Sequence, residues 1–341
     1  MTLLVTGGCG FIGSNLIKYL LKNREGLRIV NIDALTYAGN RSSLTNVELD
    51  PRYTFIKLDI SDIDGMENVF QEHLPNAVIN CAAESHVDRS LEGSIDFAKT
   101  NVLGVQVILE LGRKYGSRIL QVSTDEVYGS LELDTNKFHE YMPLEPTSPY
   151  AASKASADLL ALASFRSYNQ DVLITRSSNN FGPYQHPEKL IPLMITNAID
   201  NKLLPIYGEG KNVRDWLHVE DHCKGLVAAL ERGTSGSIYN ISGDNERTNI
   251  SVVKLILSIL GRPESLVRHV SDRAGHDLRY GSDFSRAKKE LGWAPNKDFD
   301  GALRETVTWY VENEDWWREC RDGMFEDYYE RQYLTPLRSS N

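Results

Sequence analysis

The chain has 341 residues, of which 41% are hydrophobic and 25% are charged, a balance that is typical of globular proteins and excludes a largely disordered chain. This length exceeds the size at which one hydrophobic core usually stops growing, so we expect a larger and a smaller lobe with a cleft between them. The formal net charge of −10 argues against nucleic acid or an anionic membrane as the main partner.

The cysteines and the N-terminus indicate the cellular compartment. Four cysteines lie far apart without CxxC spacing, which favours neither a disulfide framework nor a zinc site and indicates a reducing environment. The apolar run Leu3 to Val5 is too short for a signal peptide or a membrane span. We therefore expect a cytoplasmic protein without a membrane partner. His218 and His222 lack the HExxH pattern and a third ligand, so no metal is expected.

The first half of the chain alternates short apolar runs with helical patterns. The predicted strands are Leu3 to Thr6, Arg28 to Ile32, Tyr53 to Leu58, Ala77 to Cys81, Arg118 to Ser123 and Asp171 to Ser177. This rhythm is typical of βαβ units, and it predicts a Rossmann-like, doubly wound parallel sheet of the α/β class.

The regular alternation ends near Asn179. From there Gly, Pro and Asn are frequent, with short helices and two strand candidates near Tyr207 and Ile238. We expect residues 1–178 to form the larger domain and residues 179–341 mainly a smaller, mixed α/β lobe, with the chain crossing back to the larger domain. The stretch Trp316 to Tyr333 is too aromatic for a disordered tail.

A glycine-rich turn follows the first strand and opens the helix of Ser14 to Lys22. Its glycines stand at positions 7, 10 and 13, with Phe11 and Ile12 between the last two. Glycine permits the sharp turn and lets backbone N–H groups approach a pyrophosphate. Asp33 ends the next strand, where a carboxylate binds an adenosine ribose and repels a 2′-phosphate. The sequence thus predicts an NAD site, with a purely structural turn as the alternative.

The GxxGxxG spacing resembles the short-chain dehydrogenase/reductase superfamily. This resemblance implies that Gly7, Gly10 and Gly13 bind the cofactor. It implies the same for further residues near the predicted strand ends: Phe11, Ile12, Asp33, Leu35, Thr36, Asp59, Ile60, Ala82, Ala83, Ser85, Thr100, Tyr150, Lys154 and Asn180.

The catalytic signature of that superfamily, YxxxK, occurs three times in the chain. Tyr53 and Lys57 lie in a predicted strand, which separates them by about 13 Å, and glycines interrupt the match at Tyr207. Only Tyr150 begins a helix, where residues i and i+4 share a face and the Lys154 ammonium can approach the phenol. A nearby cation lowers the pKa of a tyrosine, so we expect Tyr150 to act as the base. A solvated Tyr and Lys on a surface helix is the alternative.

An acidic pair follows the fifth strand, in Ser123 to Gly129. This segment, together with Asn179 to Tyr184, Arg214 to His222 and Asp272 to Asp277, closely resembles the dTDP-glucose 4,6-dehydratase family. The resemblance implies catalytic roles for Thr124, Asp125, Glu126, Tyr150 and Lys154.

The implied reaction begins when Tyr150 takes the C4 hydroxyl proton of the sugar, held by Thr124, while NAD⁺ accepts the C4 hydride. Glu126 then removes the C5 proton as Asp125 protonates the departing C6 hydroxyl, so one carboxyl must be protonated while its neighbour is ionised. NADH finally returns its hydride to C6. The alternative for the acidic pair is that it merely caps or solvates a loop.

The same resemblance implies dTDP-glucose as substrate and a set of residues that bind it. They are Ser85, Thr124, Asn179, Lys189, Leu190, Pro205, Ile206, Tyr207, Arg214, Asn249, Asp272, Arg273 and His276. Arg214, with Arg279 as a second candidate, has the guanidinium group that binds phosphate oxygens bidentately. Two departures from the family pattern are Ala274, where Pro is usual, and the loop from Lys137 to Met142.

The superfamily resemblance also implies a homodimer, formed by the helix that carries Tyr150 and the helix of Val102 to Lys114. Leu159, Leu160, Leu162 and Phe165 supply apolar side chains there. Three functions remain open: a dehydratase, an epimerase or decarboxylase on the same scaffold, and a non-catalytic NAD-binding regulator.

Overall fold

A seven-stranded parallel sheet forms the centre of the computed structural model, which describes residues 1–273, 275–321 and 323–334. Neighbouring strands follow the order β10-β6-β5-β4-β1-β2-β3, and every neighbouring pair is parallel. The bounds are β1 Thr2–Thr6, β2 Arg28–Asp33, β3 Tyr53–Lys57, β4 Ala77–Asn80, β5 Arg118–Thr124, β6 Val172–Ser177 and β10 Ile238–Ile241. The predicted fold class is confirmed, and each of the six expected strands lies within one residue of its predicted ends.

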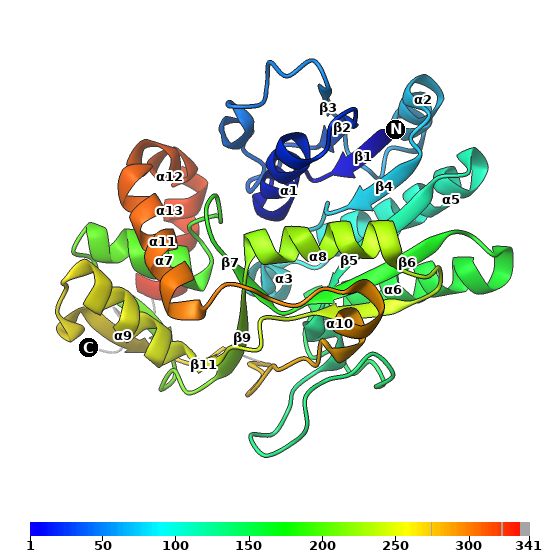
Figure 1. Ribbon diagram of the computed structural model, residues 1–341. Coiled ribbons are helices and arrows are strands. Elements are labelled where there is room, and N and C mark those ends of the chain that lie inside the picture. The colour runs from blue at the N-terminus through cyan, green and yellow to red at the C-terminus, as the bar shows by residue number, and fades with distance from the viewer. Residues whose placement is uncertain (274, 322, 335–341) are drawn as a thin grey trace.

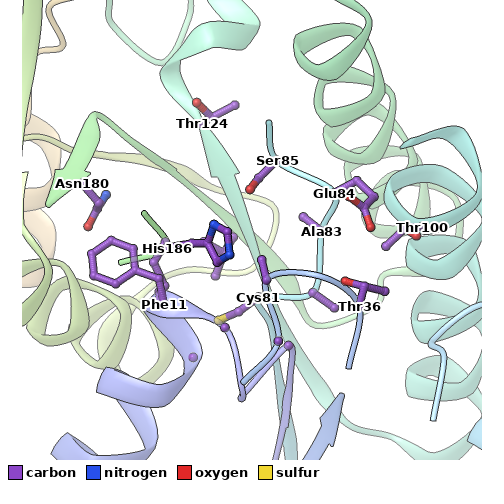
Figure 2. A pocket seen from close by; sticks show the side chains of 18 of the residues that line it. Phe11, Thr36, Cys81, Ala83, Glu84, Ser85, Thr100, Thr124, Asn180 and His186 are labelled. Atoms are coloured by element: carbon purple, nitrogen blue, oxygen red, sulfur yellow. The ribbon is translucent and has the colours of Figure 1, made fainter. Parts of the chain in front are cut away.

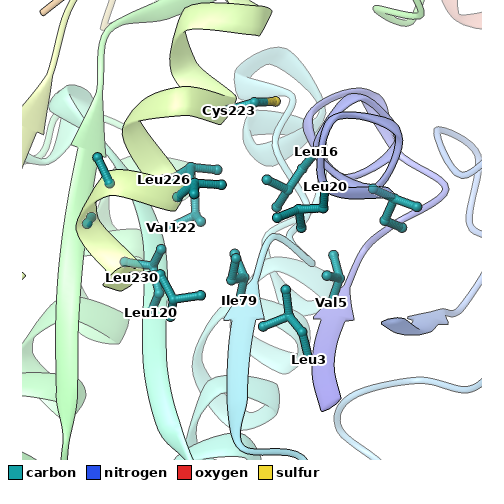
Figure 3. Close-up of a cluster of buried hydrophobic side chains, with 14 of the residues drawn as sticks. Leu3, Val5, Leu16, Leu20, Ile79, Leu120, Val122, Cys223, Leu226 and Leu230 are labelled. Atoms are coloured by element: carbon teal, nitrogen blue, oxygen red, sulfur yellow. The ribbon is translucent and has the colours of Figure 1, made fainter. Parts of the chain in front are cut away.

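Helices cover both faces of this sheet (Figure 1). Along β1, Leu3 and Val5 point to one face and Leu4 to the other, as the two-residue period of a strand requires. The first face packs on α1 (Phe11–Asn23) and α8 (Val219–Arg232), and Figure 3 shows their leucines meeting those of β1 and β5. The other face packs on α2 (Ile63–His73), α5 (Val105–Tyr115) and α6 (Pro149–Tyr168).

A second hydrophobic core lies in the smaller lobe, where helices gather beside short strands (Figure 1). Its helices are α7 (Leu190–Ile199), α9 (Asn249–Leu260), α11 (Phe299–Glu312), α12 (Glu314–Cys320) and α13 (Gly323–Tyr329). Its strands are β7 (Asn179–Phe181), β9 (Val213–His218) and β11 (Glu246–Thr248) in one sheet, and β8 (Leu204–Tyr207) and β12 (Val267–Val270) in another. Trp317, Phe325 and Tyr328 are buried in this core.

The chain returns to the large sheet after residue 178. The strand candidate near Tyr207 is β8 of the smaller lobe, whereas the candidate near Ile238 is β10, which pairs with β6. Helices α8 and α10 (Ser285–Leu291) pack beside β10 as well. Among the residues that the structure describes, no helix is both long and apolar enough to cross a membrane.

Candidate active site

A cavity opens at the carboxyl ends of β1, β2, β4 and β5, beside the point where the strand order reverses between β1 and β4. Open α/β sheets bind their ligands at this kind of position. Figure 2 shows its wall, with Thr36 and Thr100 toward one end and Thr124 at the other. Every residue predicted to bind the cofactor lines this cavity except Leu35.

The glycine turn is shaped by close backbone contacts. Gly7 has a φ of 66°, and a Cβ there would stand 2.6 Å from the Ala82 nitrogen. A Cβ on Gly13 would stand 2.3 Å from the Gly7 carbonyl oxygen, so only glycine lets α1 start this close to β1. No side chain caps α1 at Gly10, which leaves its first backbone N–H groups directed at the cavity. Such a helix N-terminus fits the pyrophosphate of NAD.

Asp33 lines the cavity one strand away. Its two carboxylate oxygens accept hydrogen bonds of 2.8 Å each from the backbone N–H groups of Cys9 and Leu35, and burial raises its pKa. Leu35 therefore acts on the site through Asp33 and not as a wall residue. Each oxygen keeps a second lone pair, as the predicted contact with a ribose hydroxyl requires.

Tyr150 and Lys154 lie at the beginning of α6, which Ser148 caps by accepting a hydrogen bond from the Ala151 N–H. Both line the cavity. The Lys154 ammonium donates to the Val122 carbonyl oxygen at 2.7 Å, and burial lowers its pKa to about 8. Burial and the nearby Glu126 raise the pKa of Tyr150, although a hydrogen bond with Thr124 opposes them. This differs from the expected lowering, because burial is the largest influence on the pKa of the phenol.

The acidic pair begins a short 3₁₀ helix, Asp125–Tyr128, whose start is capped by Thr124: the Glu126 N–H donates to the Thr124 hydroxyl at 3.2 Å. Glu126 lines the cavity, and Asp125 is buried behind it, with Ser282 Oγ at 3.3 Å from its carboxylate. Burial, Glu126 and Asp215 raise the pKa of Asp125 well above its usual range. Burial also raises the pKa of Glu126, but Arg273, Lys189 and Arg214 oppose that rise.

The environment thus separates two adjacent carboxyls. The protonated form is favoured more strongly at Asp125, which lies against other acids, than at Glu126, which faces cations. That is the arrangement in which one carboxyl acts as an acid and its neighbour as a base.

Of the residues predicted to bind substrate, Ser85, Thr124, Asn179 and Lys189 line the cavity, and Lys189 donates to the Ser85 carbonyl oxygen at 2.7 Å. The remaining nine do not line it. Leu190 begins α7, Asn249 begins α9, Pro205, Ile206 and Tyr207 lie on β8, Arg214 lies on β9, and Asp272, Arg273 and His276 follow β12.

Other groups of this chain already bind several of those side chains. Arg273 pairs with Asp88 at 2.9 Å, and the Tyr207 hydroxyl donates to the same carboxylate at 2.9 Å. His276 contacts Asp272 at 2.6 Å. Arg279, the second arginine candidate, pairs with Glu246. Ala274 lies outside the described residues.

Some of the unpaired polar atoms belong to residues that are predicted to bind a ligand. The side-chain oxygens of Asn179, Asn180 and Asn249 and the Nε of Arg273 are buried without a hydrogen-bond partner among the described residues. Buried polar atoms are rarely left unpaired, and those that are require an explanation. All four residues belong to the predicted cofactor and substrate sets.

The sequence reasoning did not identify several other wall residues. Cys81 and Ser177 lie where β4 and β6 end, so the rule on strand ends could have found them. Gln185, His186 and Glu188 reach the cavity from an irregular segment, which carries no periodic signal. Figure 2 places His186 opposite Glu84, another wall residue that was not predicted.

Comparison with known proteins shows which family the chain resembles. The sequence model described as GDP-mannose 4,6 dehydratase matches residues 4–306. The dTDP-glucose 4,6-dehydratase of Escherichia coli is 46% identical to this chain, over 95% of this chain and 98% of that protein. A dTDP-glucose 4,6-dehydratase of Streptomyces venezuelae, solved with NAD and TYD bound, is 48% identical with a TM-score of 0.91, covering 94% of this chain and 100% of its own.

A more distant similarity concerns a UDP-glucose 4-epimerase of Thermotoga maritima. Its structure, solved with UDP-glucose, is 29% identical with a TM-score of 0.86, covering 92% of this chain and 100% of its own. The scaffold is therefore shared with epimerases, whereas the higher identity lies with dehydratases. Together with the buried acidic pair beside Tyr150, this shows that the chain belongs to the dTDP-glucose 4,6-dehydratase family.

Proposed function

We propose that this protein is an NAD-dependent hydro-lyase that converts dTDP-glucose to dTDP-4-keto-6-deoxyglucose with loss of water. The observation that carries the proposal is the buried pair Asp125 and Glu126, whose surroundings separate their pKa values beside Tyr150 and Lys154. A relative solved with NAD and TYD bound supports the cofactor and the nucleotide class of the substrate. The pathway would be one that makes deoxysugar nucleotides of the dTDP-rhamnose type.

The cofactor would be held by the glycine turn, Asp33 and the N-terminus of α1. Bound NAD supplies a hydride acceptor for C4 of the sugar and a hydride donor for C6. The protein's own groups move the protons: Tyr150 takes the C4 hydroxyl proton, and the Thr124 hydroxyl holds the same oxygen. Glu126 removes the C5 proton, and Asp125 donates its proton to the leaving C6 hydroxyl.

Cations around Glu126 would receive the diphosphate. Arg273, Lys189 and Arg214 each lower the pKa of the Glu126 carboxyl, so all three are near enough to act on one point of the site. The guanidinium of Arg214 lies 4.2 Å from the centre of the Tyr280 ring, and this contact orients the guanidinium. Guanidinium groups are suited to phosphate oxygens because they donate in a planar fork.

A homodimer is the assembly we propose, formed through α6 and the helix of Val102 to Lys114. Leu159 of α6 and Leu103 are 57% and 51% exposed, whereas Leu160, Leu162 and Phe165 are partly buried against the core of their own chain. A second copy would remove this apolar surface from water. The four cysteines form no disulfide, which supports a reducing compartment, and we propose the cytoplasm.

The experiment is incubation of the purified protein with dTDP-glucose, followed by mass spectrometry of the nucleotide sugar. Loss of one water is the expected result. An unchanged mass with a new epimer would instead identify an epimerase, loss of carbon dioxide from a uronic acid substrate a decarboxylase, and the absence of turnover with any sugar nucleotide a regulator.

A further inference from the structure

The segment between β2 and β3 forms one wall of the cavity. We call residues 34–44 the cofactor loop, because Ala34, Thr36, Ala38 and Gly39 line the cavity next to Asp33. Within its own domain the loop is tied by the Asn40 N–H, which donates to the Cys9 carbonyl oxygen at 3.0 Å. Within the same domain Arg41 pairs with Glu48 and Leu44 packs in the core of the large sheet, whereas Tyr37, Asn40 and Ser43 contact a different part of the chain.

The first of these contacts is made by Tyr37. Its hydroxyl faces the carboxylate of Glu188, which adds to the effect of burial in raising the pKa of the phenol, and Glu188 lines the cavity just before Lys189. The guanidinium of Arg89 lies 4.1 Å from the centre of the Tyr37 ring and binds the Glu188 carboxylate at 3.0 Å. The neighbouring cations hold the pKa of Glu188 at about 2, so the acceptor is charged. Hydrogen bonds to a charged acceptor are the stronger kind.

The second group of contacts is made by α12. The Trp316 indole N–H donates to Ser43 Oγ at 3.2 Å, and the Asn40 amide contacts Cys320 Sγ at 3.4 Å. Ser43 and Asn40 belong to the part of the loop that forms the short 3₁₀ helix Arg41–Leu44 and its cap. The Trp316 ring packs against Tyr184 and Trp309, with centroids 5.4 and 5.3 Å away. The donor is therefore fixed in place by an aromatic cluster of the smaller lobe.

From these contacts we infer that α12 and Glu188 hold the cofactor loop closed over the adenosine end of bound NAD. Release of the cofactor then requires the loop to detach from the smaller lobe at Tyr37, Asn40 and Ser43. Tyr37 and Trp316 are positioning residues in this scheme, because they act on NAD through the loop. The inference rests on the proposed function only in that NAD is the bound molecule.

The proposed reaction explains why the loop would stay closed over NAD. The cofactor is reduced and reoxidised within one cycle, so it need not leave between turnovers. A loop that stays closed would retain NAD without adding a contact to the reacting atoms. The rate of NAD dissociation, and not the rate of the proton transfers, is therefore the quantity that these contacts control.

The test compares NAD dissociation from the wild type with that from Trp316→Phe, Tyr37→Phe and Ser43→Ala. Protein carrying NAD is diluted into isotopically labelled NAD, and mass spectrometry follows the loss of the unlabelled cofactor. Each single substitution removes one polar contact and keeps most of the packing, so we expect dissociation to be about 3- to 10-fold faster. Because Trp316 and Ser43 share one bond, the variant carrying both changes should dissociate no faster than the faster single variant.

Trp309→Phe is the matched control. It trims the same kind of ring from the same aromatic cluster, but among the described residues Trp309 makes no hydrogen bond to the loop. Because an aromatic ring remains at position 309 to support Trp316 and no hydrogen bond is lost, its dissociation rate should rise less than that of Trp316→Phe. Equal acceleration by Trp309→Phe, or unchanged rates in both Tyr37→Phe and Trp316→Phe, would overturn the inference.

This assay contains no sugar nucleotide, so its outcome is separate from that of the proposed reaction. A protein that binds NAD, responds to the loop substitutions and fails to dehydrate dTDP-glucose would contradict the proposed function and leave this inference standing. A wild-type protein that loads no NAD would overturn the inference itself.

Discussion

Replacement of Glu126 by glutamine separates the oxidation of the sugar from the loss of water. Glutamine keeps the size of the side chain but cannot accept the C5 proton. General base catalysis commonly contributes a factor of about 10²–10⁴, so elimination should slow by that factor. The C4 oxidation should survive, because Tyr150, Thr124 and Lys154 are untouched.

The same substitution removes a negative charge from beside the phenol. Glu126 is the largest electrostatic contribution that raises the pKa of Tyr150, after burial itself. In Glu126→Gln the pKa of Tyr150 should fall, because the phenolate no longer faces a carboxylate. The pH profile of C4 oxidation should therefore extend to lower pH in the variant than in the wild type.

The assay is stopped-flow absorbance of the reduced nicotinamide after mixing with dTDP-glucose, repeated across a range of pH. The reduced cofactor should accumulate in Glu126→Gln and pass only transiently in the wild type. Glu132→Gln, a change at an exposed loop position, is the control and should match the wild type. Full turnover by Glu126→Gln, or an unshifted pH profile of its oxidation step, would refute the reasoning.

Three further predictions follow from the same geometry. Asp125→Asn should slow water loss by about 10²–10⁴-fold and extend the pH profile of C4 oxidation to lower pH by less than Glu126→Gln does, because Asp125 raises the pKa of Tyr150 less than Glu126 does; an equal or larger shift by stopped-flow would contradict this. Gly13→Ala should abolish NAD binding measured by calorimetry, since its Cβ would stand 2.3 Å from the Gly7 carbonyl oxygen, and wild-type affinity would show that α1 can move. Burial lowers the pKa of His222 from 6.5 to about 3 in the folded protein. As the pH falls below about 6.5, His222 therefore binds a proton in the unfolded chain but not in the folded one, and the folded protein loses stability. Urea unfolding should show that His222→Gln loses up to about 2 kcal/mol less stability than the wild type between about pH 6.5 and pH 5; an identical loss in both proteins would remove His222 from this effect.

Much of the fold could be predicted from local sequence. The strands β1 to β6 were found because a fully buried parallel strand is a short apolar run between turn signals. The glycine turn could be predicted because the backbone approaches Gly7 and Gly13 too closely for any side chain to fit there. The pair Tyr150 and Lys154 could be distinguished from two other YxxxK matches because helical spacing places them on one face.

Only the tertiary structure decided how these groups act. The sequence shows two adjacent acids, but their separation depends on what surrounds each, namely Asp215 near Asp125 and Arg273 near Glu126. The helical spacing predicts that Lys154 lowers the pKa of Tyr150, yet burial and Glu126 raise it.

The position of the cofactor loop was likewise decided by tertiary contacts. Tyr37 contacts Glu188, and Ser43 contacts Trp316. The partners are far apart in the sequence, and a periodic pattern gives no information about such contacts. Local patterns determine which backbone forms where, since each residue's conformation depends on its near neighbours. The pKa of a buried group and the partner of a loop depend instead on distant segments, which meet only after the chain has folded.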